Sequence, residues 1–312
     1  MNNVLIAQLL NSVVLRLYLV ICGKKQPFTS NSRAIRIRSV PISNSAATKA
    51  FPETQFELFL SNGFCRRARD HLGRTNLRDV LITMLMHFGG LRMSEALSLW
   101  VEDVQWKGGQ VLVQIFHPED GLSPDGKSNR ASYLAKEYGL LPRNRLPKGK
   151  DKSFLGWKNP LVKAGEGYCF DVFFFPLEAS FEFARLWLEY HRRQRVKPAM
   201  DARHPYAFTN IEGEPYSYAA FRDAHRRAVR RIGMRSGKME GTTPHGHRHA
   251  YGQRLEGAGA SREIIKEAMH HVSLESSEVY TEPSTQTVRR KLKELENIRD
   301  QKYCTDMLNE LV

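Results

Sequence analysis

The apolar positions of the chain follow helical spacing in several stretches that begin after residue 50. In the clearest stripe, apolar residues follow the first one three, four, seven, eight and eleven positions later, as expected for a helix lying on a core. Gly89 and Gly90 then end this helix. Further helices are expected from about Met93, in the segment 181–190 and over AAFRDAHRRAVRRIG. The stripe consists of Leu77, Val80, Leu81, Met84, Leu85 and Phe88.

Two segments have the character of β-strands. GGQVLVQIF alternates between apolar and polar positions, and YCFDVFFFPL is rich in aromatic and β-branched residues. Residues 117–165 lie between them and hold many of the Gly, Pro and Lys residues, so they are expected to form a long and poorly ordered basic excursion within a small sheet.

Residues 1–50 differ in character from the rest of the chain. Their first part is apolar, but Gln8, Asn11 and Arg16 interrupt it and no basic residue precedes it, which makes a poor signal peptide and a short membrane span. An amphipathic helix that packs on a partner or on the main domain is the favoured interpretation, and an upstream sequence read as coding by mistake is the alternative. The remainder is rich in Ser, Asn and basic residues and predicts a linker or an extended arm.

Charge narrows the class of partner. The 47 lysines and arginines against 33 aspartates and glutamates give a formal net charge of +14, which favours a polyanion, and nucleic acid first. An ordinary basic protein is the alternative. Within the basic excursion Lys148, Lys150 and Lys152 are candidate DNA-binding residues. The four cysteines are scattered without a CxxC pair, which indicates neither a disulfide framework nor a cysteine zinc site and fits a reducing cytoplasm.

The segment GTTPHGHRHAYGQRL combines helix-start signals with cationic chemistry. Thr243 is a good N-cap and Pro244 a good first residue, so His245 and Arg248 share a face of the first turn, where backbone amides also favour an anion. This predicts a phosphate site. A zinc site is the alternative, because five imidazoles lie near each other. Against it, ligand spacings such as HExxH are absent. The five are His245, His247, His249, His270 and His271.

A second helix is expected to begin at Ser261 and to carry His271 at its C-terminal end. Nine residues after His271 comes Tyr280, in the polar segment SLESSEVYTEPS. A lone tyrosine in such a segment is ordinarily a partly buried surface residue.

These residues carry a family resemblance. The C-terminal part resembles the signature of the tyrosine recombinase (phage integrase) family, in which a HxxRH motif precedes a helix that ends in a histidine and then a nucleophilic tyrosine. It reads TPHGHRHAYGQRLEGAGASREIIKEAMHHVSLESSEVYTEP. Upstream, FGGLRMSEALSLWVEDV resembles the family's first arginine box. The resemblance implies a fold that is mainly α with a small antiparallel β-sheet (α+β), the tyrosine recombinase catalytic-domain fold.

The resemblance also implies roles for residues. The catalytic set would be Arg92, His245, Arg248, His271 and Tyr280, and a lysine from the β-hairpin region. Glu95 would support Arg92. Lys163, before the turn AGEG, is the first choice for the lysine, and Lys158 is the second. The chain departs from the family where Met269-His270 replaces the usual Leu-Gly and where His247 replaces the common Leu.

The chemistry implied by the resemblance is DNA transesterification. The tyrosine attacks a phosphodiester, forms a 3′-phosphotyrosyl link and releases a 5′-hydroxyl, so bond energy is conserved and no cofactor or metal is expected. Two other functions stay open. One is relaxation of DNA by a type IB topoisomerase, which uses a similar residue set, and the other is a catalytically weak DNA-binding accessory protein.

The expected organisation has three parts. Residues 1–50 hold the apolar helix and basic arm, which are too few to build the helical domain with which the family closes around DNA. Residues 51–283 are the catalytic domain, and 284–312 are a helical tail that docks on a neighbouring protomer or on its own domain. The expected partners are double-stranded DNA and further copies in a tetramer, with accessory proteins left open and no membrane. The cytoplasm, on the nucleoid, is the expected location.

Overall fold

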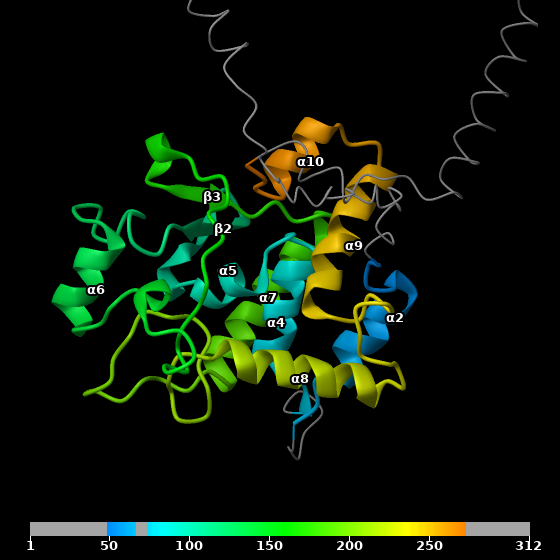
Figure 1. Cartoon of the computed structure of the whole chain (residues 1–312), viewed down its shortest axis with the longest axis horizontal. Coiled ribbons are helices and arrows are strands. Elements are labelled where there is room, and N and C mark those ends of the chain that lie inside the picture. The colour runs from blue at the N-terminus through cyan, green and yellow to red at the C-terminus, as the bar shows by residue number, and fades with distance from the viewer. Residues whose placement is uncertain (1–48, 67–73, 273–312) are drawn as a thin grey trace, which may run out of the picture. The chain divides into compact units, whose positions relative to one another are not determined.

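The computed structural model describes residues 49–66 and 74–272, all of which fall in one unit, Asn44–Val312. The predicted N-terminal helix, Tyr280 and the C-terminal tail lie outside the described residues. Helices dominate the rest, with a small antiparallel sheet, as the sequence predicts (Figure 1). No helix among the described residues is both long and apolar enough to cross a membrane.

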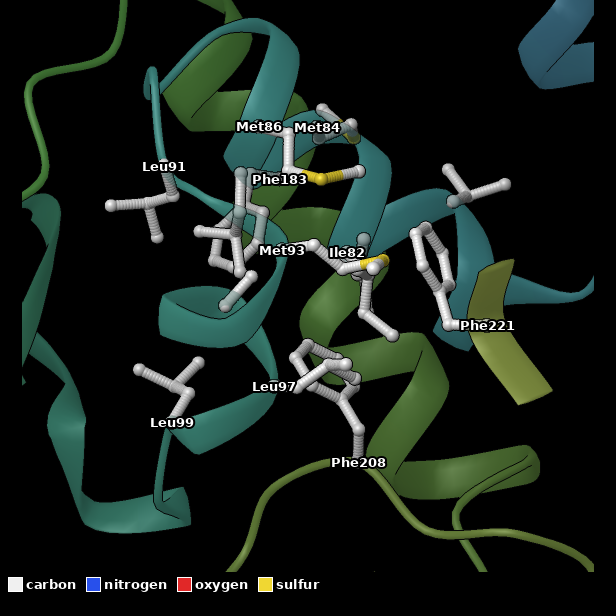
Figure 2. Packing of buried hydrophobic residues seen from close by; sticks show 14 of the residues in the cluster. Ile82, Met84, Met86, Leu91, Met93, Leu97, Leu99, Phe183, Phe208 and Phe221 are labelled. Carbon is white, nitrogen blue, oxygen red and sulfur yellow. The ribbon is translucent and has the colours of Figure 1, made fainter. Parts of the chain in front are cut away.

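Helix α4 (Leu77–His87) is the central element of the core. Asn76 caps it by accepting a hydrogen bond from the Asp79 backbone amide, and the chain leaves it at Phe88. The sequence predicts an apolar stripe on this helix, yet all of its residues except Arg78 are buried, including polar Thr83. The reason is that α4 packs against α5 (Met93–Ser98), α7 (Glu178–Arg193), α8 (Tyr218–Arg231) and α9 (Pro244–Gly257). Figure 2 shows this packing around Ile82, Met84 and Met86.

The sheet has three antiparallel strands in the order β1 (Val104–Lys107), β2 (Gln110–Phe116) and β3 (Cys169–Asp171). Val104 pairs with Val113, and Ile115 pairs with Phe170, so buried side chains of β2 and β3 face the core. The segments predicted from the sequence correspond to β2 and β3, and the excursion of residues 117–165 connects them.

The excursion is more ordered than its composition suggests. It contains α6 (Arg130–Tyr138) and the short helices η3 (Arg143–Arg145) and, at its end, η4 (Ala164–Glu166). Two buried arginines hold it. Arg130 forms an ion pair with Asp103 in η2 (Val101–Asp103). Arg143 donates hydrogen bonds to the carbonyls of Leu97 (2.9 Å), Tyr216 (2.9 Å) and Ser153 (2.6 Å), and burial lowers the pKa of its guanidinium to about 10.

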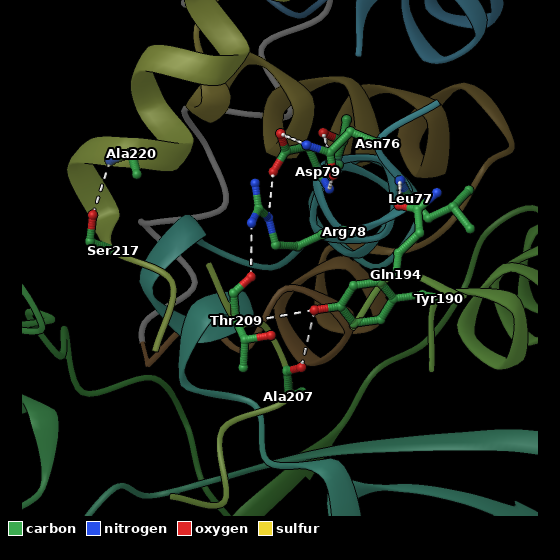
Figure 3. A network of polar contacts seen from close by, with 11 residues as sticks. Asn76, Leu77, Arg78, Asp79, Tyr190, Gln194, Ala207, Thr209, Ser217 and Ala220 are labelled. Carbon is green, nitrogen blue, oxygen red and sulfur yellow. Dashed lines mark hydrogen bonds and ion pairs between the residues drawn. The ribbon is translucent and has the colours of Figure 1, made fainter. Parts of the chain in front are cut away.

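A polar network joins the start of α4 to the end of α7 and to the segment before α8 (Figure 3). Arg78 donates to the Thr209 carbonyl at 2.8 Å, and Gln194 accepts from the Leu77 amide at 3.0 Å. Tyr190 accepts from the Thr209 amide at 3.2 Å. These bonds satisfy buried polar groups between packed helices, and they tie the segment at Thr209 to α4 and α7.

Two short elements, α2 (Glu53–Leu58) and η1 (Phe59–Gly63), contact each other, and η1 packs on α8. Phe51 precedes them and donates its backbone amide to the Gly246 carbonyl at 2.9 Å. The helix α10 (Arg262–Ala268) comes after α9 and packs on it through Ile265 and Met269. The starts of α5 and α9 and the end of α10 therefore lie around one place in the fold.

Candidate functional site

Arg92 lies at the start of α5, after a tight turn. Gly90 in this turn has φ +67°, and a Cβ there would lie 2.5 Å from the ring of Tyr251, so only glycine fits without movement. Glu95 closes the first turn: its carboxylate accepts from the Arg92 amide at 2.7 Å and from the Arg92 guanidinium at 2.6 Å. Glu95 is buried, whereas the Arg92 side chain is 22% exposed. The buried carboxylate therefore holds the Arg92 guanidinium in place while part of this side chain still reaches solvent.

Arg248, from the first turn of α9, is completely buried. Its guanidinium donates to the carbonyls of Gly90 and Met269, and one nitrogen lies 3.9 Å from the carboxylate of Glu95. The two predicted arginine boxes therefore meet at Glu95, although Arg92 and Arg248 are far apart in sequence. One buried carboxylate between two guanidinium groups leaves a net positive charge at this position.

His245 stands on the same turn of α9 and is exposed on the pocket side. Gly246 beside it allows the Gly241 carbonyl to approach the helix more closely than any Cβ would permit. Burial of part of the ring, together with Arg248, Lys158 and Arg92 nearby, lowers the pKa of His245 to about 4. The imidazole is therefore neutral at pH 7 and can accept a proton.

His271 comes after α10 and a left-handed turn. Its amide donates to the Lys266 carbonyl at 2.9 Å, the His270 amide donates to the Glu267 carbonyl at 3.1 Å, and His270 takes φ +56°. Burial, with Arg248 and Arg92 nearby, lowers the pKa of His271 to about 3. The predicted helix is present with Ser261 as its N-cap, but it ends at Ala268, three residues before His271. His271 lies close enough to Arg92 and Arg248 to feel their charge.

A pocket of about 640 Å³ opens beside these residues. None of the residues that line it is acidic, and five are cationic. An anion such as a phosphate is the ligand that this charge favours. The cationic residues are Arg92, Lys158, Arg222, Arg226 and Lys238, and His245, Thr243 and Pro244 add the start of α9.

The structure separates the two candidate lysines. Lys158 lines the pocket together with Arg92 and His245. Lys163 lies outside the pocket lining, at the start of η4, and forms ion pairs with Glu267 (3.3 Å) and Glu166 (3.9 Å). The hydrogen bond that Lys163 donates to Glu267 raises the pKa of its ammonium group.

The three predicted DNA-binding lysines, Lys148, Lys150 and Lys152, are exposed, as expected for a surface loop. Two of them line a separate pocket of about 750 Å³ that also contains acidic residues. These acidic residues are Asp151, Asp201, Glu212 and Glu214. The structure therefore does not bring these lysines into the cationic pocket.

The alternative of a zinc site finds no support in residues 49–66 and 74–272, which contain no group of three or more His, Cys, Asp or Glu side chains that could hold a metal ion. His245 and His249 lie edge to face with ring centroids 4.4 Å apart, whereas His247 turns into the core.

Sequence reasoning missed several residues of the pocket. Arg222 and Arg226 are spaced four apart on the basic helix α8, and this spacing could have placed both on one face. His225 also lines the pocket, but nothing in the sequence distinguishes it from a core histidine.

Comparisons with known proteins bear on the family and the fold of the chain. Residues 176–287 match the model of the phage integrase family. No curated protein matches the chain. Among solved structures, the XerH site-specific recombinase bound to palindromic difH substrate, a post-cleavage complex, is similar with a TM-score of 0.51 and 19% identity over 81% of this chain and 56% of the XerH chain.

The Tn1549 transposon integrase in complex with circular intermediate DNA is also similar. One such structure has a TM-score of 0.51 and 17% identity over 89% of this chain and 76% of the integrase chain. Another has a TM-score of 0.51 and 16% identity over 91% and 76%. At these identities the likeness shows the fold. The chain therefore carries a phage integrase family domain over residues 176–287, set in the fold of a tyrosine recombinase catalytic domain.

Proposed function

We propose that this protein is a site-specific DNA recombinase or integrase that cuts and rejoins DNA through a 3′-phosphotyrosyl link to Tyr280. The observation that carries the proposal is the junction of Arg92 and Arg248 on Glu95, beside a cationic pocket. Guanidinium groups offer planar donors that match phosphate oxygens and stay charged at any relevant pH. A scissile phosphate in this pocket would be held and its developing charge stabilised.

His245 is the proposed proton acceptor for the tyrosine. A free phenol, with a pKa near 10, is a weak nucleophile at neutral pH until a base accepts its proton. His245 is neutral at that pH, as its lowered pKa requires. His271, near both arginines, would donate a hydrogen bond to the phosphate through its ring N–H.

The departing 5′-oxygen needs a proton, and a lysine is the proposed donor. Lys158 lies in the wall of the pocket, whereas Lys163 is engaged by two carboxylates outside it. We therefore propose Lys158 for this role in preference to Lys163, the first choice from the sequence. The exposed Lys148, Lys150 and Lys152 would contact the DNA backbone outside the reaction centre.

The biological setting is proposed by analogy. The structures that resemble this chain are of a recombinase and a transposon integrase, both in complex with DNA. We propose double-stranded DNA as the partner, a tetramer on paired sites as the active assembly, with accessory proteins where the element needs them, and a mobile element as the context. Its place would be the cytoplasm, on the nucleoid. The chain covers just over half of the XerH chain, so the activity of a complete recombinase is part of the proposal.

The decisive experiment is trapping of the covalent intermediate. The protein is incubated with nicked DNA that carries candidate ends of the mobile element. Cleavage next to the nick releases a short fragment that diffuses away, so the covalent protein–DNA adduct cannot be rejoined. A covalent adduct is expected with the native chain and none with Tyr280→Phe. The variant Tyr218→Phe changes a tyrosine of the pocket wall and serves as the matched control, which is expected to form the adduct.

Two outcomes would contradict the proposal. The first is DNA binding without an adduct on any cognate end. The second is an adduct that survives in Tyr280→Phe. Relaxation of a supercoiled plasmid without special sites would instead favour a topoisomerase.

A further inference from the structure

Three buried histidines from three helices form one hydrogen-bonded row beneath the site. His247 of α9 is the middle member. Its Nδ1 lies 3.2 Å from Nδ1 of His87 in α4, and its Nε2 lies 2.8 Å from Nε2 of His225 in α8. The row continues to α2, because Nε2 of His87 lies 3.2 Å from a carboxylate oxygen of Glu53. Four residues that are distant in sequence thus share one chain of hydrogen bonds.

The surroundings of the row keep the imidazoles neutral. Phe51 stacks on His247 with ring centroids 4.3 Å apart, and Phe56 stacks on His87 with centroids 3.4 Å apart, so the rings are packed among apolar groups. Burial lowers the pKa of His87 to about 4 and that of His225 to about 3, and it holds the pKa of His247 well below its usual value. At neutral pH each ring therefore carries one N–H.

The carboxylate sets the direction of these N–H groups. Glu53 can only accept, so Nε2 of His87 carries the proton and Nδ1 of His87 accepts from Nδ1 of His247. Nε2 of His247 then accepts from Nε2 of His225. The result is a bare lone pair on Nδ1 of His225, a buried atom without a hydrogen-bond partner among the described residues.

Arg254 of α9 offers the opposite arrangement, because its guanidinium lies 3.1 Å from Nε2 of His87. In that arrangement the donor and the acceptor of each hydrogen bond in the row exchange roles, and Nδ1 of His225 carries an N–H for which residues 49–66 and 74–272 offer no acceptor. A buried donor without an acceptor is rarer and costlier than an unused lone pair. Arg254 also has a better partner in Glu53, at 2.5 Å. The first arrangement is therefore the resting one.

The two ends of the row belong to two different pockets. His225 lines the cationic pocket that holds Arg92 and His245. Glu53 and Arg254 line a second pocket, of about 620 Å³, and the side chain of Glu53 is 53% exposed. The row therefore runs from the candidate site through the core to solvent.

We propose that Glu53, His87, His247 and His225 are a proton relay for the site, an inference that rests on the proposed function. Nδ1 of His225 accepts, through water in the pocket that both rings line, the proton that His245 has taken from the attacking tyrosine. The Nε2 proton of His225 passes to Nε2 of His247, the Nδ1 proton of His247 passes to Nδ1 of His87, and the Nε2 proton of His87 passes to Glu53 and then to solvent. One proton enters and one leaves, and every imidazole ends neutral in its other tautomer.

This route suits a site covered by DNA, from which water cannot easily carry a proton away. It also suits the burial of the rings, because exchange between neutral tautomers avoids a lasting imidazolium in an apolar core. His247 stands where the family commonly has leucine, so the relay would be a feature of this chain that the family signature does not require.

Because the family commonly has leucine at this position, His247→Leu is the variant that tests the relay most directly. His247→Leu fills the buried position with an apolar side chain and interrupts the row. The rate of covalent adduct formation with nicked DNA is expected to fall about a hundredfold, as for loss of a positioned acid–base group. His191→Leu is the matched control, because His191 is a partly buried imidazole on α7 that contacts the ring of Trp187 and lies outside the row. The control is expected to react at the native rate.

A second variant tests whether a loss of rate comes from misfolding. Glu53→Gln changes the half-exposed end of the row and also removes the ion pair with Arg254, and a loss of rate is expected there too in a protein that still unfolds cooperatively on heating. A folded His247→Leu protein that reacts at the native rate would overturn the relay.

Nitrogen-15 NMR of the histidine rings, recorded on the full chain without DNA, gives a reading that does not depend on activity. At pH 7 His225 is expected to carry its proton on Nε2, and Glu53→Gln is expected to shift the tautomers of His87 and His225. A proton on Nδ1 of His225 in the native chain would overturn the relay. If the native chain forms no adduct at all, the proposed function fails, whereas the tautomers still decide whether the row is oriented as inferred.

Discussion

At the residue scale, the decisive feature is Glu95, a single buried carboxylate shared by two arginines. It orients the partly exposed Arg92 through two hydrogen bonds and lies 3.9 Å from the fully buried Arg248. Buried charges need partners, and a buried ion pair is costly to break because the remaining charge stays desolvated. The resemblance gave Glu95 a supporting role for Arg92, and the geometry extends that support to Arg248.

Glu95→Gln is expected to lower the free energy of unfolding by about 3 kcal/mol, because it leaves two guanidinium groups without their carboxylate. Urea denaturation at pH 7 measures the change. Glu182→Gln is the control: its ion pair with Arg185 is about half exposed on both sides, so a loss of less than about 1 kcal/mol is expected. Equal losses in the two variants would contradict the role given to Glu95.

His245 leads to a prediction about pH. Its pKa is lowered to about 4, so the ring stays neutral and able to accept a proton throughout the range from about pH 7.5 to about pH 6. The rate of adduct formation is therefore expected to stay flat across that range, measured in single-turnover cleavage of nicked DNA. A rate that fell with an apparent pKa near 6.5 would mean that the acceptor is an ordinary exposed imidazole.

At the element scale, the basic excursion between β2 and β3 decides which lysine reaches the pocket. Arg130 and Arg143 anchor it to the core, and the Leu161 amide donates to the His270 carbonyl at 3.1 Å. Lys158 then falls in the pocket wall and Lys163 at a paired turn. Sequence order had placed Lys163 first because of its proximity to β3. The contacts of the excursion place Lys158 in the pocket wall instead, so Lys158 becomes the preferred candidate for the proton donor.

Lys158→Ala is expected to slow cleavage of ordinary DNA about a hundredfold, and Lys163→Ala to slow it much less. DNA with sulfur in place of the bridging 5′-oxygen supplies a leaving group that needs no proton, so this substrate is expected to restore the rate of Lys158→Ala. Both rates are measured in single-turnover reactions. A greater loss in Lys163→Ala, restored by the sulfur substrate, would return the role to Lys163.

At the scale of the whole molecule, the core contains several histidines that burial keeps neutral. His87 and His225 are almost completely buried, and both have a pKa far below the usual value because of burial. Each takes up a proton in the unfolded chain near pH 6.5 but not in the folded chain above about pH 4. Their contribution to stability is therefore complete above about pH 6.5 and is lost as the pH falls toward about 4.

These two histidines are accordingly expected to contribute up to about 3 kcal/mol per pH unit to the fall in the free energy of unfolding below about pH 6, at about 1.4 kcal/mol for each. Urea denaturation at pH 7.5, 6 and 5 measures the slope. His225→Phe is expected to make the slope shallower, because it removes one titrating group. The same free energy at pH 7.5 and 5 would show that the two histidines titrate alike in both states.

The sequence alone was enough for the family resemblance, the mainly helical fold with its small sheet, and the positions of Arg92, His245, Arg248 and His271, because these depend on local motifs and on spacing along a helix. Tertiary structure decided the rest. Only packing brings Glu95 between two arginines from distant parts of the chain, places Lys158 in the pocket, and aligns His225, His247 and His87 in a row. These contacts join elements far apart in the sequence, and hydrophobic patterning records which face of each helix is buried but not which residue it meets.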